Sequence, residues 1–304
     1  MSTRATGVLL ALATAAISGF AVFINGYAVK RFDDATVYTT AKNGVAGVLL
    51  VLLALPLLRA GQGAVRPAPR PRSAVQWLAL LAVAVVGGSV PFVLFFEGLA
   101  RASSTQAAFI HKTLVVWVAL LAVPLLRERL SWAHFAAIGL LIGGQLVLAG
   151  DTGTVSVGSG ELMIFAATLL WAVEVVFVKR LLESLAAPTL AAARLGIGTL
   201  LLVGFVALSG RWSDLAALGG PQWAWALLTG VVLAGYVATW YAALARAQAV
   251  DVTAVLVLGA VVTALLDRGI EGAPLDALGV GLIALGGAIA ALRLLYPPAR
   301  PLPA

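Results

Sequence analysis

His111 and Lys112 are neighbours inside the apolar stretch AAFIHKTLVVWVALL, which runs from Ala107 to Leu121. An imidazole can donate or accept a hydrogen bond and can change charge with pH, and an ammonium attracts a carboxylate. Lys112 lies about 12 Å along a helix from Ser104, where the apolar segment begins. A lysine stem does not comfortably span that distance to the membrane surface, so at least one of the two side chains should face water or a partner.

Two interpretations of this pair stay open. In the first, the helix lines an aqueous cavity that opens outward, where Lys112 attracts a carboxylate and His111 hydrogen-bonds the substrate. In the second, His111 is a packing residue bonded to a neighbouring carbonyl group. Neighbouring helical residues point about 100° apart, so the two side chains cannot share one narrow face. The first interpretation predicts substrate-binding roles for both residues.

Aromatic side chains on other apolar segments are typical of a mostly apolar pocket for a small molecule. Trp171 lies near the middle of its segment and three residues before Glu174, so the two share nearly the same helix face. Tyr236 and Trp240 are one helical turn apart, and Phe96 belongs to a phenylalanine-rich segment. We predict substrate contacts from these side chains. The alternative for each ring is plain packing or a place in the interfacial aromatic belt.

The composition identifies the setting of these residues. Of 304 residues, 62% are hydrophobic and only 11% are charged, whereas soluble domains carry about 25% charged residues. The composition therefore indicates an integral membrane protein. The net charge of +7 comes from arginines in short gaps between apolar runs, so no nucleic-acid partner is expected. The absence of cysteine excludes disulfides, thiolate catalysis and thiolate-bound metals.

Cuts at charged residues and at Pro and Gly leave ten apolar segments of about 20 residues, the length that spans a bilayer. Continuous runs of this kind exclude a β-barrel, so the predicted fold is an all-α integral membrane protein with ten transmembrane helices. The segments begin near Ala5, Ala35, Val75, Ser104, Trp132, Glu161, Pro188, Gln222, Asp251 and Leu275. The first run has no clear cleavage site and is expected to be a helix, not a signal peptide. A Pro- and Arg-rich linker (59–72) and a disordered Pro-rich tail (297–304) are expected between and after the helices.

Basic residues predict the orientation. With the amino terminus inside, twelve Lys and Arg residues fall in inside segments and five in outside segments. An excess of basic residues marks the cytoplasmic side, so both termini are expected in the cytoplasm. The preference for Arg over Lys and the Ala-rich composition are typical of a GC-rich bacterium. The expected location is therefore the bacterial inner (plasma) membrane.

Three short motifs recur in the same order about 145 residues apart. The recurring pairs are VKR at 29–31 and 178–180, LARA at 99–102 and 244–247, and Glu128 and Glu271 with the Gly–Gly pair that follows each. They predict two five-helix repeats, at residues 1–150 and 151–296. Because five is an odd number, the second repeat must be inverted. Inverted repeats are typical of transporters whose binding site lies between the halves.

The stretch RERLSWAHFAAIGLLIGGQLVLAG resembles the end of an EamA domain of the drug/metabolite transporter superfamily, and WAVEVVFVKR resembles the opening of that domain. As two tandem domains the resemblance covers nearly the whole chain, and the layout is most similar to the YddG-type amino-acid exporters. It implies a secondary transporter that exports or exchanges a small metabolite by alternating access. Two departures stand out. Val115 and Leu258 occupy places where many members have Pro, and Val22 stands where Trp171 sits in the second copy.

The repeat alignment places Asn25 opposite Glu174 and Lys42 opposite Arg194. Because buried charges usually have partners, it predicts a Glu174–Arg194 pair in the cytoplasmic half and an Asn25–Lys42 contact in the outer half. Alternatively, Lys42 and Arg194 extend to the interface, and Glu174 faces the cavity to meet a substrate amine or a proton. Glu97, at the end of the third segment, is expected to be solvated in the outer mouth or to bind substrate.

Small residues indicate which of the membrane helices can bend or move. Gly87, Gly88 and Pro91 interrupt the third segment, and Gly235 lies in the eighth, its counterpart. Gly and Pro in membrane helices permit bends and close approach. We predict that these two helices act as gates, with Lys42 in a structural role beside them.

These features favour a secondary transporter of a small metabolite, foremost an amino acid. The alternative with the same fold is a proton-coupled multidrug or nucleoside/metabolite exporter. The chain has no Walker loop and no HExxH or GxSxG motif, and His134, its second histidine, is expected at the interface, so an intramembrane enzyme is a distant alternative. No metal, cofactor or obligatory oligomer is expected; the partners are the small-molecule substrate and the lipid bilayer.

The inverted counterpart of His111 and Lys112 falls within residues 254–257, which are all apolar. The polar pair therefore has no mate in the second repeat. Asymmetry in a duplicated scaffold is where specialised function is expected. The sequence predicts that His111 or Lys112 faces the outward-open cavity.

Overall fold

The structure is a computed structural model that describes residues 3–59, 70–102, 104–149 and 158–296. Most of the predicted linker at 59–72 and the whole predicted tail at 297–304 lie outside the described residues. Arg66, Arg300 and Asp151, which entered the prediction of orientation, lie outside them as well. The account below concerns the described ranges.

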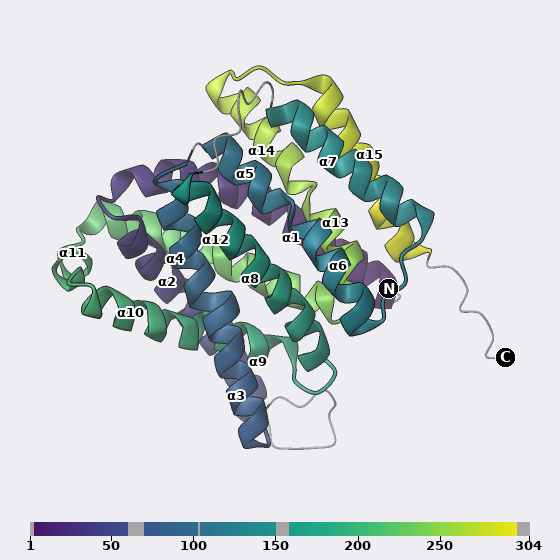
Figure 1. Ribbon diagram of the computed structural model, residues 1–304. Coiled ribbons are helices and arrows are strands. Elements are labelled where there is room, and N and C mark those ends of the chain that lie inside the picture. The colour runs from purple at the N-terminus through teal and green to yellow at the C-terminus, as the bar shows by residue number, and fades with distance from the viewer. Residues whose placement is uncertain (1–2, 60–69, 103, 150–157, 297–304) are drawn as a thin grey trace.

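All regular elements of the described ranges are helices (Figure 1). In the first half they are α1 (Thr3–Ala28), η1 (Val29–Arg31), α2 (Ala35–Arg59), α3 (Ala74–Val83), η2 (Ala84–Ser89), α4 (Val90–Leu99), α5 (Ser104–Lys112), α6 (Leu114–Leu126) and α7 (Trp132–Ala149). In the second half they are α8 (Ser159–Leu181), α9 (Ala187–Ala192), η3 (Ala193–Ile197), α10 (Gly198–Leu208), α11 (Trp212–Ala216), α12 (Gly220–Leu244), α13 (Ala249–Leu256), α14 (Gly259–Leu266), η4 (Asp267–Glu271) and α15 (Ala277–Leu295).

The predicted helical membrane fold is confirmed. Nine segments of the described ranges are long and apolar enough to cross a membrane, and Trp132–Leu148 is a tenth, shorter apolar helix. Large apolar side chains such as Leu53, Leu200 and Leu208 are exposed on their outer faces. A bilayer tolerates such exposure because its interior is as apolar as the side chains themselves.

Helices from the two halves pack against each other in equivalent pairs. The first helix, α1, packs against α12 and α14, and the first helix of the second half, α8, packs against α4 and α6. The last helices, α7 and α15, lie side by side along one edge of the molecule (Figure 1). These pairings agree with two repeats of one five-helix unit, and they place the core of the molecule between the halves.

Two of the membrane segments are broken near their middle. The fourth divides into α5 and α6 at Thr113, and the ninth divides into α13 and α14 at Val257 and Leu258. At the first break the Thr113 hydroxyl donates to the Ile110 carbonyl at 2.6 Å, which holds the turn. Broken helices at membrane depth are tolerated where they are buried in protein or line a cavity. The sequence analysis did not predict either break.

Two other segments contain a π-helical turn. The turn η2 interrupts the third segment, as its small residues predict, and η3 interrupts the seventh. The two turns pack on each other so closely that a Cβ added to Gly88 in η2 would lie 2.8 Å from the Arg194 carbonyl carbon in η3. The eighth segment, α12, is by contrast one continuous helix. Single π turns of this kind occur frequently at functional sites.

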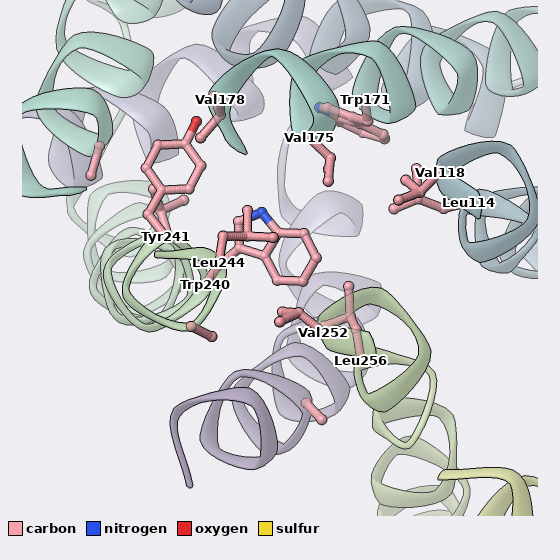
Figure 2. Close-up of a cluster of buried hydrophobic side chains, with 14 of the residues drawn as sticks. Leu114, Val118, Trp171, Val175, Val178, Trp240, Tyr241, Leu244, Val252 and Leu256 are labelled. Atoms are coloured by element: carbon pink, nitrogen blue, oxygen red, sulfur yellow. The ribbon is translucent and has the colours of Figure 1, made fainter. Parts of the chain in front are cut away.

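A cluster of buried apolar side chains lies between α6, α8, α12 and α13 (Figure 2). Trp240 lies at its centre, with Val252 and Leu256 on one side and Trp171 and Val175 on the other (Figure 2). Burial of apolar surface at about 25 cal/mol per Å² makes large aromatic side chains the main contributors to such a cluster. The cluster therefore joins the two halves at the centre of the molecule.

Candidate functional site

A small cavity lies where the two broken helices meet. Its lining residues are His111, Lys112, Leu114 and Val115 from the fourth segment, and Thr253, Leu256 and Val257 from the ninth. The space is narrow and has room for about one water molecule. Because the lining comes from both halves and from both breaks, movement of either half-helix changes its size.

His111 occupies the last turn of α5 and is surrounded by aromatic rings. Its imidazole lies edge-on to Phe95 and to Trp171, with ring centroids 5.3 Å and 5.0 Å apart. Its Nδ1 atom is buried without a hydrogen-bond partner in the described structure. A buried polar atom without a partner costs about 1–3 kcal/mol. A ligand that forms a hydrogen bond with Nδ1 would remove this cost and would therefore bind more tightly.

Lys112 is the last residue of α5 and one of the seven residues that line the cavity. Within the described ranges its ammonium makes no hydrogen bond and no ion pair with another residue. The cavity lining contains no acidic side chain. An ammonium at this depth is costly unless water, a partner or a ligand compensates it. The site therefore offers an uncompensated positive charge to whatever enters.

Trp171 connects this site to the π turn of the third segment. Its indole Nε1 donates a hydrogen bond of 3.2 Å to the carbonyl oxygen of Gly87 in η2. Its ring also lies against Phe92 and Phe95, at 5.4 Å and 5.6 Å between centroids. The Gly87 carbonyl cannot accept a helical bond from residue 91, because Pro91 has no N–H, and a buried acceptor without a donor is unfavourable.

The predicted contact between Glu174 and Arg194 is present. The Arg194 Nη1 atom lies 3.9 Å from Glu174 Oε1, and the Tyr241 hydroxyl donates to the same carboxylate oxygen. Arg194 Nε also donates to the Gly87 carbonyl at 3.2 Å. The alternative that Arg194 extends to the interface is wrong, since the residue is only 4% exposed. Partners on three helices hold it inside the protein.

The predicted contact between Asn25 and Lys42 is present as well. Lys42 Nζ donates to Asn25 Oδ1 at 3.3 Å, and the Tyr38 hydroxyl donates to the same oxygen. The ammonium lies over the rings of Phe96 and Tyr38, 4.3 Å and 4.9 Å from their centroids. Extension of Lys42 to the interface is again wrong, because it is 3% exposed. Cation–π contacts and an amide oxygen stand here in place of the carboxylate of the second repeat.

The remaining predicted aromatic residues are not among the seven residues that line the cavity. Tyr236 and Trp240 stack with centroids 6.2 Å apart, and Trp240 is buried in the apolar cluster of Figure 2. Phe96 belongs to the ring cage of Lys42.

The glycines singled out for gating differ in their surroundings. A Cβ on Gly87 would lie 2.6 Å from Glu174 Cγ, and a Cβ on Gly88 would collide with the Arg194 carbonyl. Pro91 stands in the first turn of α4, where a missing N–H is tolerated. Gly235, in contrast, meets only Ile17 Cδ1 at 3.8 Å. Close packing thus requires small residues in η2 but not at Gly235.

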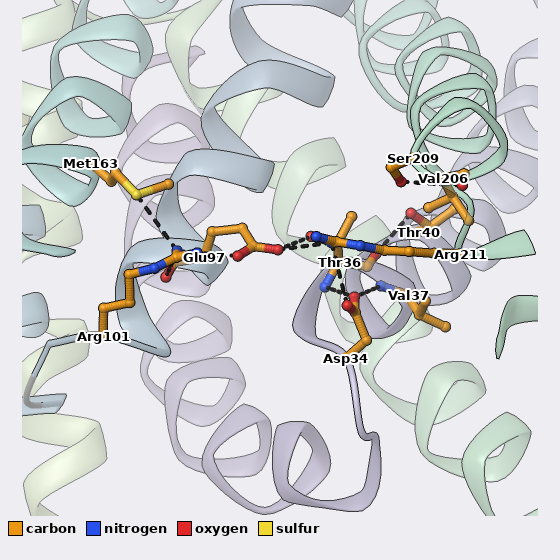
Figure 3. A network of polar contacts seen from close by, with 10 residues as sticks. All are labelled: Asp34, Thr36, Val37, Thr40, Glu97, Arg101, Met163, Val206, Ser209 and Arg211. Carbon is orange, nitrogen blue, oxygen red and sulfur yellow. Dashed lines mark hydrogen bonds and ion pairs between the residues drawn. The ribbon is translucent and has the colours of Figure 1, made fainter. Parts of the chain in front are cut away.

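One interpretation expected Glu97 to be solvated, but its carboxylate is bonded to other side chains. It is the centre of a polar network that joins three loops (Figure 3). Arg211 Nη1 lies 2.9 Å from Glu97 Oε1, Arg101 Nη1 lies 3.1 Å from Oε2, and the Thr36 hydroxyl donates to Oε1 at 2.8 Å. Arg211 also reaches Asp34 at 3.3 Å. The hydrogen bond to Glu97 raises the pKa of the Arg211 guanidinium above its usual value.

A second polar cluster ties down the start of α13. The Glu128 carboxylate accepts from the backbone N–H groups of Ala249 at 2.7 Å and Val250 at 3.2 Å. Burial raises the pKa of Glu128 above its usual value, against the effect of these two bonds. A carboxylate here caps the exposed donors of a helix start. The sequence signal was present, because Glu128 directly follows an apolar segment, but its partner could not be identified without the fold.

His134, which the sequence analysis expected at the interface, belongs to the same cluster. It is 3% exposed, and its Nδ1 accepts from the Ser131 backbone N–H at 2.9 Å. Its Nε2 must then carry the proton that is shared with Asp251 Oδ1 at 3.1 Å. The pair joins α7 to α13, which explains why both polar side chains are tolerated. Within the described ranges, no group of three or more His, Cys, Asp or Glu side chains could hold a metal ion.

Comparison with known proteins gives a consistent picture. Residues 5–150 and 158–295 each match the EamA-like transporter family. A protein of Archaeoglobus fulgidus described as an uncharacterized transporter is 29% identical over 221 residues, which are 70% of this chain and 74% of that protein. A crystal structure with 18% identity superposes with a TM-score of 0.75 and covers 96% of this chain and 98% of that one. At that identity the likeness concerns the fold alone.

Proposed function

The chain belongs to the EamA-like transporter family, and from this premise we propose that it is a secondary transporter that moves amino acids, or metabolites similar to them, by alternating access. The proposal includes net export or facilitated exchange, as in the YddG-type exporters. It also includes the bacterial inner membrane, with both termini in the cytoplasm. Two tandem five-helix units with helices broken at their centre support it, because such transporters bind substrate between repeats at discontinuous helices.

One observation carries the choice of site. Lys112 presents a cation without a partner in the described structure, at the break of the fourth segment and opposite the break of the ninth. His111 adds a buried nitrogen without a hydrogen-bond partner. Transporters commonly place the charged group of a substrate at such interruptions. In the proposed function Lys112 binds the substrate carboxylate, and His111 with the adjoining Trp171 contacts the rest of the molecule.

In this proposal the cavity is narrow because the structure represents an intermediate of the transport cycle that is closed to both sides of the membrane. In this proposal the Glu97–Arg211 network of Figure 3 closes the path from the cavity toward one side of the membrane. The apolar cluster of Figure 2 closes the path toward the other side. With the proposed orientation, the network is outer and the cluster is inner. Substrate would enter when one of them separates and leave when the other does. Binding shifts the balance between the two open states only as far as it favours one of them.

Counterflow in proteoliposomes tests the proposal. Vesicles loaded with unlabelled amino acid should accumulate labelled amino acid transiently, and the flux should saturate with concentration. A channel would give flux without saturation and without counterflow. The absence of counterflow for all twenty amino acids would contradict the amino-acid proposal.

A second candidate function is proton-coupled export. Glu174 favours it, because a buried carboxylate with one cation 3.9 Å away is a group that could gain and lose a proton during transport. Uptake with and without an imposed pH gradient separates the candidates. If Glu174→Gln leaves gradient-driven flux unchanged, Glu174 is not the coupling group.

A further inference from the structure

We infer that the site recognises its substrate through the carboxylate and the apolar side chain, and that it has no receptor for a substrate ammonium. The inference rests on the proposed function and deepens it. It predicts that an amino acid without its amino group binds as well as, or better than, the amino acid itself. It also predicts that the corresponding amine without its carboxylate does not bind.

The first step is the charge balance of the cavity. Lys112 brings one ammonium, and the six other lining residues are one imidazole, one hydroxyl and four aliphatic side chains. A zwitterion that enters would pair its carboxylate with Lys112 and bring a second ammonium into the same small space. Like charges in a medium of low dielectric repel strongly, so the second cation needs an acid of its own.

The second step is that the acidic side chains on the helices around the cavity are already engaged. Glu174 bonds to Tyr241 and faces Arg194. Asp251, two residues before the lining residue Thr253, shares a proton with His134. To serve a substrate amine, either carboxylate would have to leave a buried partner without compensation, which is strongly unfavourable.

Glu97, near the end of α4, is engaged as well. It accepts from Arg211, Arg101 and Thr36 at once (Figure 3). No acid among the described residues is thus left free at the cavity. A carboxylate ligand gains a charged partner on entering, whereas an ammonium ligand gains none.

The third step concerns the neutral polar atoms. The Thr253 hydroxyl donates to the Ala249 carbonyl at 2.6 Å, so only its lone pairs stay available to a ligand. His111 Nδ1 is the other free polar atom. Both could accept from an ammonium, but neither carries a negative charge, so an ammonium forms no ion pair with them, whereas a carboxylate forms one with Lys112. The difference favours the carboxylate.

The fourth step is the apolar part of the ligand. Leu114, Val115, Leu256 and Val257 line the cavity, and the rings of Phe95 and Trp171 lie behind His111. Such walls stabilise an aliphatic or aromatic body. The chemical class is therefore an organic monocarboxylate with an apolar side chain, whether or not it also carries an amino group.

A binding experiment on the purified full chain tests this directly. We would measure thermal stability with three acids (propanoate, 4-methylpentanoate and 3-phenylpropanoate) and with three matched amines (ethylamine, 3-methylbutylamine and 2-phenylethylamine). A ligand that binds only the folded state raises the melting temperature with concentration. At least one acid should do so and no amine should. Stabilisation by an amine as large as that by its matched acid would overturn the inference, as would the absence of stabilisation by all three acids.

Variants link the response to the proposed residue. Lys112→Met should weaken the acid's apparent affinity at least about tenfold, which is the effect of one charge-assisted hydrogen bond. The control is Lys30→Met, which removes the same charge from an exposed position and should leave the affinity unchanged. Equal affinity of the Lys112→Met variant and the wild type would overturn the inference. If Lys112→Met does not fold, Lys112→Arg provides a second test, because it should keep the preference for acids over amines.

Counterflow separates this inference from the proposed function. If amino acids exchange but the amines compete as well as the acids, the inference fails and the transport proposal stands. If no amino acid exchanges but the acids stabilise the protein through Lys112, the amino-acid proposal fails and the recognition of a carboxylate stands.

Discussion

The imidazole of His111 and the indole of Trp171 lie edge to face, with centroids 5.0 Å apart and planes at 69°. The first residue ends α5 in the first half of the chain, and the second lies in α8 in the second half. The indole nitrogen in turn bonds to the Gly87 carbonyl of the π turn η2. One aromatic side chain thus connects the cavity with the interruption of the third membrane segment.

Trp171→Phe should uncouple these two features. The ring contact with His111 is largely kept, but the hydrogen bond to Gly87 is lost, which should reduce the free energy of unfolding by about 1 kcal/mol. We expect a larger effect on the counterflow rate than on stability, because η2 loses its connection to the site. The matched control is Trp77→Phe, since Trp77 is 58% exposed on α3. Equal rates for both variants would show that the indole bond has no part in transport.

Glu174→Gln should destabilise the protein strongly. The substitution leaves the buried Arg194 guanidinium without its counter-charge, and breaking one partner of a buried pair costs about 3–5 kcal/mol. Replacement of both residues, as Glu174→Gln with Arg194→Met, should recover much of that loss. Thermal unfolding of the three variants in detergent checks the order. A single variant as stable as the wild type would show that the pair is not coupled in the folded state.

Gly88→Ala should destabilise the contact between η2 and η3. The added Cβ would collide with the Arg194 carbonyl, and overpacking of this kind costs about 1–3 kcal/mol. The control is Gly204→Ala in α10, where a Cβ meets nothing within 4 Å and a helical Ala is favoured over Gly. Melting temperatures should fall for the first variant and stay level or rise for the second. The opposite order would contradict the close packing of the two π turns.

Arg211→Gln should loosen the network on the proposed outer side. Arg211 bridges Glu97 and Asp34 but is partly exposed, so stability should fall by about 1 kcal/mol or less. We expect the variant to open more often toward the outside. A cysteine at position 256 should then react faster with an impermeant thiol reagent that is added outside. Arg268→Gln, at an exposed site with only a 3.4 Å hydrogen bond to Ala273, serves as the control. An unchanged reaction rate would mean that the network does not restrain opening.

The helical fold and the polar pairs could be predicted from the sequence. Long apolar runs have one structural solution in a bilayer, and they predicted the ten segments. The repeat then placed Asn25 beside Lys42 and Glu174 beside Arg194, because residues equivalent in the alignment occupy equivalent positions in space. The small residues around Gly88 likewise predicted the interruption of the third segment.

Other features depend on contacts that no local pattern contains. The break at Thr113 has no Pro or Gly and therefore no local signal. The turn η3 contains Gly196 and is followed by Gly198, a signal like that of the third segment, but the sequence analysis did not use it. The contact partner of His134 is Asp251, which lies 117 residues away in the sequence. Glu97 and its partner Arg211 are likewise far apart, 114 residues along the sequence. Long-range pairing of this kind appears only once the helices are packed.

The central claim is that the cavity between the two broken helices is the transport path. The chain has no cysteine, so Leu256→Cys places one thiol in the cavity lining, and Ser213→Cys places one at an exposed control site. The most direct measurement is the rate at which a small water-soluble thiol reagent modifies each cysteine in membranes, with and without saturating 3-phenylpropanoate. The account predicts that position 256 reacts, that the acid slows its reaction severalfold, that Lys112→Met abolishes this protection, and that position 213 is unaffected. No reaction at position 256 from either side of the membrane, or the same rate with and without the acid, would contradict it.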